Sequence, residues 1–397
     1  MNKPEAQPVS IRVHGSLADV DAREWDACAN PSGQPFNPFV SHAFLSALEE
    51  SESATAETGW LPRHLTVEDG CGRIVGAAPC YLKSHSQGEY VFDYGWADAY
   101  HRAGGRYYPK LQISVPFTPV PGRRLLVRDG ADEALVRNQL ATGAVEVARR
   151  LEASSVHLTF IDEPAWHALG QDGWLQRTDT QFHWQNAGHS TFDDFLGALA
   201  SRKRKMIRKE REAVRRAGIE HEWVTGSDLK ERHWDHFFDF YMDTGSRKWG
   251  SPYLSRKFFS LIGEKLAEHI LLVMAKRNGR MIAGALNFIG SDALYGRNWG
   301  ALEHHEFLHF ETCYYQAIEF AIARGLSRVE AGAQGAHKLA RGYLPTTTRS
   351  LHYLADPRLS RAVADYLEHE RHEVERDSRF LADHSPYRHM DEEEGAF

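Results

Sequence analysis

The clearest pattern along the chain is an alternation of apolar and polar residues, interrupted by a glycine turn, that occurs twice. The first copy reads LTVEDGCGRIVGAAPCYL from Leu65, and the second reads LLVMAKRNGRMIAGALNFI from Leu271. In both copies the alternating residues flank a Gly-Arg pair, which is typical of a β-hairpin with a short or bulged loop. The pattern therefore predicts an equivalent hairpin in each half of the chain.

The segments that follow the two hairpins match in kind and order. Each hairpin precedes an aromatic stretch, YVFDYGW to Trp96 and ALYGRNW to Trp299, which we predict as a third strand. An amphipathic helix and a further strand, expected to lie parallel to the preceding one, then follow. The helical spacing is carried by Val136, Leu140, Ala144, Val147, Ala148 and Leu151 in the first copy and by Phe310, Cys313, Tyr314, Ala317, Ile318, Ala321 and Ile322 in the second. We therefore expect an α+β chain of two β-β-β-α-β units.

A strongly basic helix is predicted between these two units. Residues 201–218 read SRKRKMIRKEREAVRRAG, carry nine Lys or Arg from Arg202 to Arg216, and end at a glycine. After residue 356 the pattern predicts a charged, packed helix followed by the acidic tail DEEEGAF. The expected ranges are 1–190 and 191–356 for the two units and 357–397 for the C-terminal helix and tail.

Length and composition fit this division. A chain of 397 residues exceeds what one core usually organises, and 42% hydrophobic with 25% charged residues is ordinary for a globular protein. The net charge of −7 argues against a general nucleic-acid binder, although a local basic patch is not excluded. The four cysteines are scattered without a C-x-x-C pair, so neither a disulfide framework nor a zinc site is predicted. We expect no transmembrane segment and a cytoplasmic protein, which can also lie peripherally on the inner membrane.

The densest group of polar candidates directly follows the last predicted strand of the second unit. Residues 330–345 read EAGAQGAHKLARGYLP, and their glycines let a ligand approach the backbone. This position corresponds to the carboxyl edge of the sheet, where α/β proteins bind ligands. We predict His337 and Lys338 as catalytic residues and Gln334 and Arg341 as substrate-binding residues; the alternative is a structural turn.

Histidines surround the start of the second unit's helix. His309 is a candidate general base, because transfer to an amine needs a proton acceptor that works near neutral pH. The alternative is that these histidines lie on the surface and that Glu311 merely stabilises the helix start. The spacing of His304, His305 and His309 fits no zinc signature, so no metal is expected. Trp299, at the end of the preceding predicted strand, is added as a substrate-binding candidate.

The first unit supplies further candidates. Asp93 lies among aromatic residues, where a raised pKa would allow it to orient or deprotonate an amine; a paired structural aspartate is the alternative. Lys110 is a nearby substrate-binding candidate. Arg123 and Arg124 can clamp a phosphate with two guanidinium groups, or they are an exposed pair at the start of a strand.

Several long motifs resemble a known family. They are FNPFVSHAFLSALE, GAAPCYLKSHSQGEYVFDYGWADAY, YYPKLQISVPFTPVPGRRLL, SRKRKMIRKER, FLHFETCYYQAIEFAI and EAGAQGAHKLARGYLP, and together they cover nearly the whole chain. In this order they resemble the predicted N-acyltransferases of Proteobacteria that are named for peptidoglycan biosynthesis or recognition. The resemblance implies a tandem GNAT-like (acyl-CoA N-acyltransferase) fold, as in the Fem-type ligases, with two units facing a shared cleft that holds the active site.

The resemblance implies an N-acyltransferase that moves an acyl or aminoacyl group from a thioester or ester to an amine, for peptidoglycan or lipid synthesis. No permanently bound cofactor is expected; acyl-CoA, acyl carrier protein and aminoacyl-tRNA are the candidate donors. The R/Q-x-x-G-x-G/A loop, by which GNAT domains bind the CoA pyrophosphate, is absent before both predicted helices. The basic helix can bind a carrier protein, tRNA or anionic membrane lipid. A non-catalytic protein that recognises cell-wall or lipid fragments is the alternative from another class.

Overall fold

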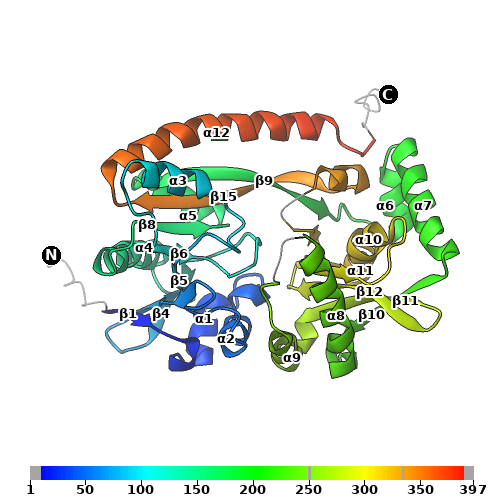
Figure 1. Ribbon diagram of the computed structural model, residues 1–397, viewed down its shortest axis with the longest axis horizontal. Helices are drawn as coiled ribbons and strands as arrows, with labels where there is room; N and C mark the ends of the chain where they lie inside the picture. Colours follow the sequence, from blue (N-terminus) through cyan, green and yellow to red (C-terminus); the bar gives the residue numbers. More distant parts are fainter. Residues whose placement is uncertain (1–9, 249–251, 333–334, 389–397) are drawn as a thin grey trace. The chain divides into compact units, whose positions relative to one another are not determined.

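A computed structural model describes residues 10–248, 252–332 and 335–388 of the chain (Figure 1). The chain forms two compact units. Unit 1 comprises Met1–Asp179, Tyr253–Ala267 and Thr348–Val374, and unit 2 comprises Thr180–Pro252, Glu268–Thr347 and Glu375–Phe397. Both units are assembled from separate stretches of sequence. The predicted domains are continuous in sequence, unlike these two units. Their division into 1–190, 191–356 and 357–397 stays a prediction.

The elements of unit 1 are β1 (Ser10–His14), η1 (Leu17–Asp19), α1 (Ala22–Ala29), η2 (Pro38–Val40), α2 (His42–Glu50), β2 (Trp60–Pro62), β3 (His64–Glu68), β4 (Ile74–Ala78), β5 (Cys80–Lys83), α3 (Tyr94–Arg102), β6 (Lys110–Ile113), β7 (Leu126–Val127), α4 (Glu133–Arg150), β8 (Ser155–Thr159), α5 (Glu163–Gln171) and α9 (Arg256–Lys265). The elements of unit 2 are α6 (Phe192–Ala198), α7 (Ser201–Arg216), β10 (Ile219–Thr225), η3 (Gly226–Asp228), α8 (Glu231–Lys248), β11 (Ile270–Arg277), β12 (Arg280–Ile289), β13 (Ala293–Ala301), α10 (Leu308–Phe310), the π-helical turn η5 (Glu311–Tyr315), α11 (Gln316–Ala323), β14 (Arg328–Glu330) and η6 (Ala336–Arg341). Residues of both units contribute to β9 (Leu175–Gln185), η4 (Ala267–His269), β15 (Leu344–Leu354) and α12 (Pro357–Asp383).

Unit 1 contains the first predicted hairpin, because β3 and β4 pair antiparallel with Leu65 opposite Ala78. These strands belong to a sheet of order β1-β3-β4-β7, whereas the part of the second sheet in this unit has the order β15-β8-β6-β5-β2. Helix α4 begins at the cap Asp132, whose carboxylate accepts a hydrogen bond from the Leu135 amide. Its apolar stripe packs on both groups of strands, and this packing forms the main core of the unit.

Unit 2 contains the second hairpin, β11 paired with β12, in the strand order β10-β11-β12-β13-β14-β9 (Figure 1). Helix α11 packs against β13 and β14, and Ala317, Ile318 and Ala321 are fully buried in that contact. Helix α7 places Ile207 and Val214 in the interior and ends before Gly218, at φ 70°. The predicted basic helix is therefore confirmed.

The exit strands also behave as predicted: β6 pairs with β8, and β13 with β14, in parallel. One element was predicted wrongly. The stretch around Trp96 is not a strand, because Tyr94–Arg102 forms α3 and the third strand of unit 1 is β6 instead. Trp96 and Tyr100, at helical spacing, pack with Leu359 of α12 in a small separate core, and this packing outweighs the strand propensity of their aromatic rings.

Candidate active site

The central feature of unit 2 is the separation of two parallel strands. In the described residues, β13 and β14 are paired from Ala293 to Tyr295 and from Arg328 to Glu330, and not beyond. On its other side β13 pairs with β12, whose register shifts between Leu286 and Asn287. A cavity of about 80 Å³ lies at this position, lined among others by Asn287, Gly296, Trp299, His309, Cys313 and Tyr314. Part of the β13 edge therefore faces a cavity instead of a neighbouring strand.

A wider hollow of about 600 Å³ lies at the start of the helix that packs on these strands. Trp299 and His309 line both the hollow and the small cavity, so the two spaces share a wall. The imidazole of His309 packs edge-on against the rings of Trp299 and Tyr314, with centroids 5.3 Å away in each case. Two sequence candidates, Trp299 and His309, therefore lie together on the wall that the hollow and the cavity share.

His337 joins the same group of residues. Its Nε2 lies 2.9 Å from the hydroxyl of Tyr314, and its ring centroid lies 6.4 Å from that of His309. Partial burial, and then the charges of Lys338 and Arg341, lower the pKa of His337 below its ordinary value. Burial raises the pKa of Tyr314, which keeps its proton. At neutral pH the pair is thus an uncharged imidazole beside a hydroxyl.

Lys338 is buried, and its ammonium donates to the carbonyl oxygen of Gly332 at 2.9 Å. Burial lowers the pKa of Lys338 to about 8, so an appreciable fraction is neutral near physiological pH. Gly332 follows Ala331, which lines the small cavity. The ammonium of Lys338 therefore bonds to the backbone directly after a residue of the cavity wall.

The remaining two candidates of this loop differ from each other. Arg341 pairs with the buried Glu210 of α7 at 2.8 Å, and its guanidinium lies 3.4 Å from the ring centroid of Phe310. This pair attaches α7 to the loop, so the structure gives Arg341 an internal partner, and its contact with a substrate stays a prediction. Gln334 lies outside the described residues.

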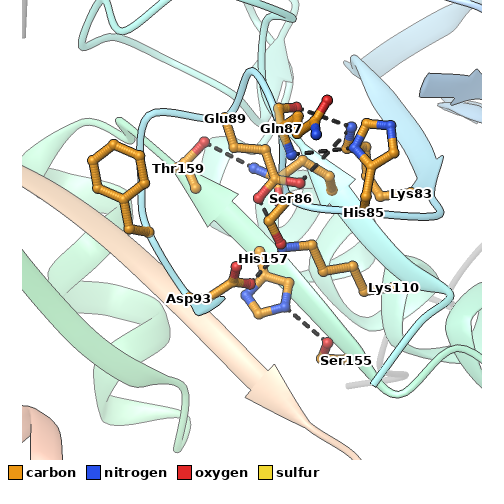
Figure 2. Close-up of polar contacts among 12 residues, drawn as sticks. Lys83, His85, Ser86, Gln87, Glu89, Asp93, Lys110, Ser155, His157 and Thr159 are labelled. Atoms are coloured by element: carbon orange, nitrogen blue, oxygen red, sulfur yellow. Dashed lines mark hydrogen bonds and ion pairs between the residues drawn. The ribbon is translucent and has the colours of Figure 1, made fainter. Parts of the chain in front are cut away.

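Two of the unit 1 candidates, Asp93 and Lys110, belong to a buried ion cluster (Figure 2). The ammonium of Lys110 contacts Asp93, and it donates to Glu89 at 2.7 Å and to Ser86 at 2.8 Å. The hydroxyl of Tyr107 donates to Asp93 at 2.7 Å. Lys110 is thus fully buried and occupied by partners from its own chain.

The expected raised pKa of Asp93 is wrong. Burial does oppose its ionisation, but the attraction of Lys110 and its hydrogen bonds outweigh burial and hold the pKa of Asp93 well below its ordinary value. Burial instead raises the pKa of Glu89 to about 7. A carboxylate that already holds an internal ammonium is a poor proton acceptor for a substrate, so Asp93 as a base is not supported by its geometry.

The cluster continues into further buried polar side chains on β6 and β8. Lys110 and Gln112 on β6, and His157 and Thr159 on β8, point to the side of the parallel pair away from α4, and all four are buried. Gln112 donates to Thr159 at 3.0 Å. Polar side chains thus fill the interior of unit 1 on that side of the parallel pair.

The arginine pair has internal partners too. Arg123 donates to the carbonyl oxygen of Ala29 at 2.7 Å, and the buried Arg124 donates to the carbonyl oxygen of Val120. Phosphate binding by Arg123 and Arg124 stays a prediction.

Helix α7 presents most of its cations to solvent. Arg208, Lys209, Arg215 and Arg216 line a groove of about 930 Å³ together with the acids Asp193, Glu212 and Glu319. Arg211 is held by Glu311 at 3.0 Å and Glu319 at 2.7 Å. Arg202 and Lys205, nearer the start of the helix, are exposed.

Comparison with known proteins now assigns the family. The model of the FemAB-like family, described as peptidoglycan biosynthesis/recognition, matches residues 16–389. The chain belongs to the FemAB-like family. A comparison with the curated proteins found no match.

Solved structures share the fold of this FemAB-like chain at low identity. FemX is 15% identical with a TM-score of 0.55, and the match covers 87% of this chain and 98% of FemX. The C-terminal domain of a putative lysylphosphatidylglycerol synthetase from Agrobacterium fabrum is 10% identical with a TM-score of 0.52, over 88% of this chain and 96% of that one. L-PGS from Bacillus licheniformis is 10% identical with a TM-score of 0.50, over 85% and 99%. The expected tandem GNAT-like α+β fold is confirmed.

Family membership and fold together support a cell-wall-related acyl or aminoacyl transferase. Within the described residues, no helix has the length and apolar character needed to cross a bilayer, and no cluster of three His, Cys, Asp or Glu side chains could hold a metal ion.

The sequence reasoning missed Tyr314 and Cys313 as site residues. Helical spacing places both on the apolar face of the helix, yet both line the cavity. They lie in the π-helical turn η5, a distortion that is frequent at functional sites and has no reliable sequence signal. The available signal was the spacing of Cys313 four residues after His309.

Proposed function

We propose that this chain transfers an acyl or aminoacyl group from a thioester or ester donor to an amine acceptor, in the small cavity of unit 2. The observation that supports this most is the loss of pairing between β13 and β14 next to His309. The separated strand leaves backbone donors and acceptors beside a cavity, where they can orient a carbonyl group. A FemAB-like chain with such a cavity has the elements that acyl transfer requires: orientation, a base and hydrogen-bond donors.

The proposed roles follow from the contacts. His309 takes the proton that the amine loses as it attacks, because its ring lies on the wall between hollow and cavity. Tyr314, whose hydroxyl donates to the neutral His337, orients the amine by accepting a hydrogen bond from it. Trp299 packs along the donor, and Lys338 supplies positive charge at the cavity wall.

Within the part of the chain that the structure describes, the hollow at the helix start has none of the features by which GNAT domains bind the pyrophosphate of acyl-CoA, which favours an aminoacyl ester as the donor. Glu303 and Glu306 line it beside His304, His305 and His309. The residue before the helix is Phe307, in a left-handed conformation and without a side-chain cap, instead of a glycine-rich loop. Acyl carrier protein and acyl-CoA are the rival donors in the test.

The amine acceptor belongs to the cell envelope, as the family description supports, and a peptidoglycan precursor and an aminolipid are the two candidates. The protein would then act in the cytoplasm or at the inner face of the membrane. A protein that only recognises such molecules would bind them without turnover.

The test is a transfer assay. Aminoacyl-tRNA, acyl-CoA and acyl carrier protein donors are each incubated with a lysine-containing peptidoglycan precursor or with phosphatidylethanolamine vesicles, and amide products are identified by mass spectrometry. We expect product with one donor class, at a rate at least about a hundredfold higher than with His309→Gln. Binding of an acceptor without product for any donor would establish the recognition protein instead.

A further inference from the structure

One helical turn of unit 2 carries an imidazole and a thiol into the same cavity. His309 and Cys313 are four residues apart, the spacing that places two side chains on one helix face, and both line the cavity of about 80 Å³. The cavity has room for only a few water-sized groups, which fits a carbonyl group with a short substituent. A thiol at this position can reach a carbonyl group that enters the cavity.

The other three cysteines have different surroundings. Cys28 and Cys80 are buried, and burial raises the pKa of Cys28 to about 11 and that of Cys80 further. Cys71 is exposed in the β3–β4 turn, away from any catalytic candidate. Cys313 alone among the four cysteines is half-buried with a cavity in front of it.

Lys338 adds a positive charge near this thiol. Its ammonium is fixed on the carbonyl oxygen of Gly332, immediately after the cavity residue Ala331. Cys313 and Lys338 are close enough to attract each other when both are charged. A buried ammonium beside a thiol stabilises the thiolate, which is the nucleophilic form.

We propose that Cys313 accepts the acyl group from the donor before the amine does, with His309 as its base. This inference rests on the proposed function and gives it a covalent step. Sγ of Cys313 attacks the donor carbonyl, the C–S bond to the enzyme forms, and the bond to the donor's sulfur or oxygen breaks. His309 takes the thiol proton and returns it to the leaving group. The amine then attacks the thioester, a C–N bond replaces the C–S bond, and the amine proton passes through His309 back to Sγ.

The first test needs no natural substrate, because 4-nitrophenyl acetate acylates activated thiols. We expect a burst of 4-nitrophenolate and a single acetyl group, which peptide mass spectrometry places on Cys313. Cys313→Ala should remove the burst, the control Cys71→Ala should retain it, and His309→Gln should slow it about tenfold or more. Melting curves of the variants show whether the fold is intact; Cys313→Ser serves if Cys313→Ala melts early.

The second test measures the rate of iodoacetamide alkylation of Cys313 against pH. Lys338→Met should shift its midpoint upward by about one pH unit, because the variant has no positive charge beside the thiol. Acetylation of Cys71 without Cys313, or an unchanged midpoint in Lys338→Met, would overturn the assignment.

The outcomes separate this inference from the proposed function. Amide product formed by Cys313→Ala at the wild-type rate removes the covalent step and leaves direct transfer. If Cys313 is acetylated but none of the tested amine acceptors receives the group, Cys313 is a nucleophile and the proposed transfer to an amine is wrong.

Discussion

The imidazole of His337 and the hydroxyl of Tyr314 lie 2.9 Å apart at the cavity of unit 2. A neutral imidazole can accept the tyrosine proton in this hydrogen bond, whereas an imidazolium cannot. Because burial and two neighbouring cations lower the pKa of His337 below 6.5, the neutral form persists at mildly acidic pH.

We therefore expect the hydrogen bond from Tyr314 to His337 to persist as the pH falls from 7.5 to 6.5 and to be lost only below that range, which the NMR signals of the His337 ring can follow. His337→Ala should lower the turnover rate about a hundredfold while changing the free energy of unfolding by less than about half a kcal/mol, because the side chain is exposed. Single-turnover rates and urea unfolding check both values. Full activity in both His337→Ala and Lys338→Ala would reduce this loop to a structural turn.

Gly335→Ala should reduce both activity and stability. Gly335 has a φ of 118°, and a Cβ there would lie 2.5 Å from Cε1 of His337. Backbone strain of this kind costs about 1–3 kcal/mol, and the clash displaces the imidazole. The matched control is Gly279→Ala, at φ 74° with no atom near the added Cβ. It should lose stability and keep its activity; equal loss of activity in both variants would contradict the role of His337.

Asp93→Asn should act on stability rather than on chemistry. It leaves Lys110 buried with fewer anionic partners, so we expect unfolding to become about 3–5 kcal/mol easier at pH 7. The pKa of Asp93 is lowered in the folded protein, so its contribution is fully present above the unfolded value near 3.8 and decreases as the pH falls below it.

Urea unfolding at pH 7 and pH 3 measures this dependence, and the gap between wild type and Asp93→Asn should narrow at pH 3. The double variant Asp93→Asn, Lys110→Met should lose less stability than the sum of the two single variants, because the two side chains form one ion pair. Additive losses would show that the two residues do not act as a pair.

Charge reversal at the start of α7 should weaken binding of an anionic partner without unfolding the helix. Arg202→Glu with Lys205→Glu alters exposed residues, and acids suit the first turns of a helix. Affinity for tRNA, acyl carrier protein and phosphatidylglycerol vesicles should be measured at several salt concentrations. For the true partner we expect weaker binding and a flatter salt dependence, by about one unit of slope for each phosphate that the helix no longer neutralises. Unchanged affinity for all three partners would show that these cations of α7 face solvent and bind no partner.

The hairpins, the long helices and the parallel exit strands could be predicted, because each depends on a local pattern of apolar residues and glycine turns. The helix from Tyr94 could not, because its apolar face is completed by Leu359, far along the chain. Fem-type resemblance supplied the fold class, which hydrophobic periodicity alone does not distinguish from other α+β arrangements.

The site was predicted less well for a related reason. Residue type and position suggested His309, Trp299 and His337, which the structure brings together, but their partners depend on tertiary distances. The raised pKa expected for Asp93 was wrong because the sequence does not show that Lys110 lies against it. The internal partner of Arg341 could not be predicted either, because Glu210 is far from it in the sequence.

The buried ion cluster of unit 1 constrains how this protein can evolve. Lys110, Asp93 and Glu89 hold one another, so replacing any one of them exposes an unpaired charge to a low-dielectric interior. A second reactive pocket could arise there only through several simultaneous substitutions. Substitutions that change specificity are therefore expected around the cavity of unit 2 and not in this cluster.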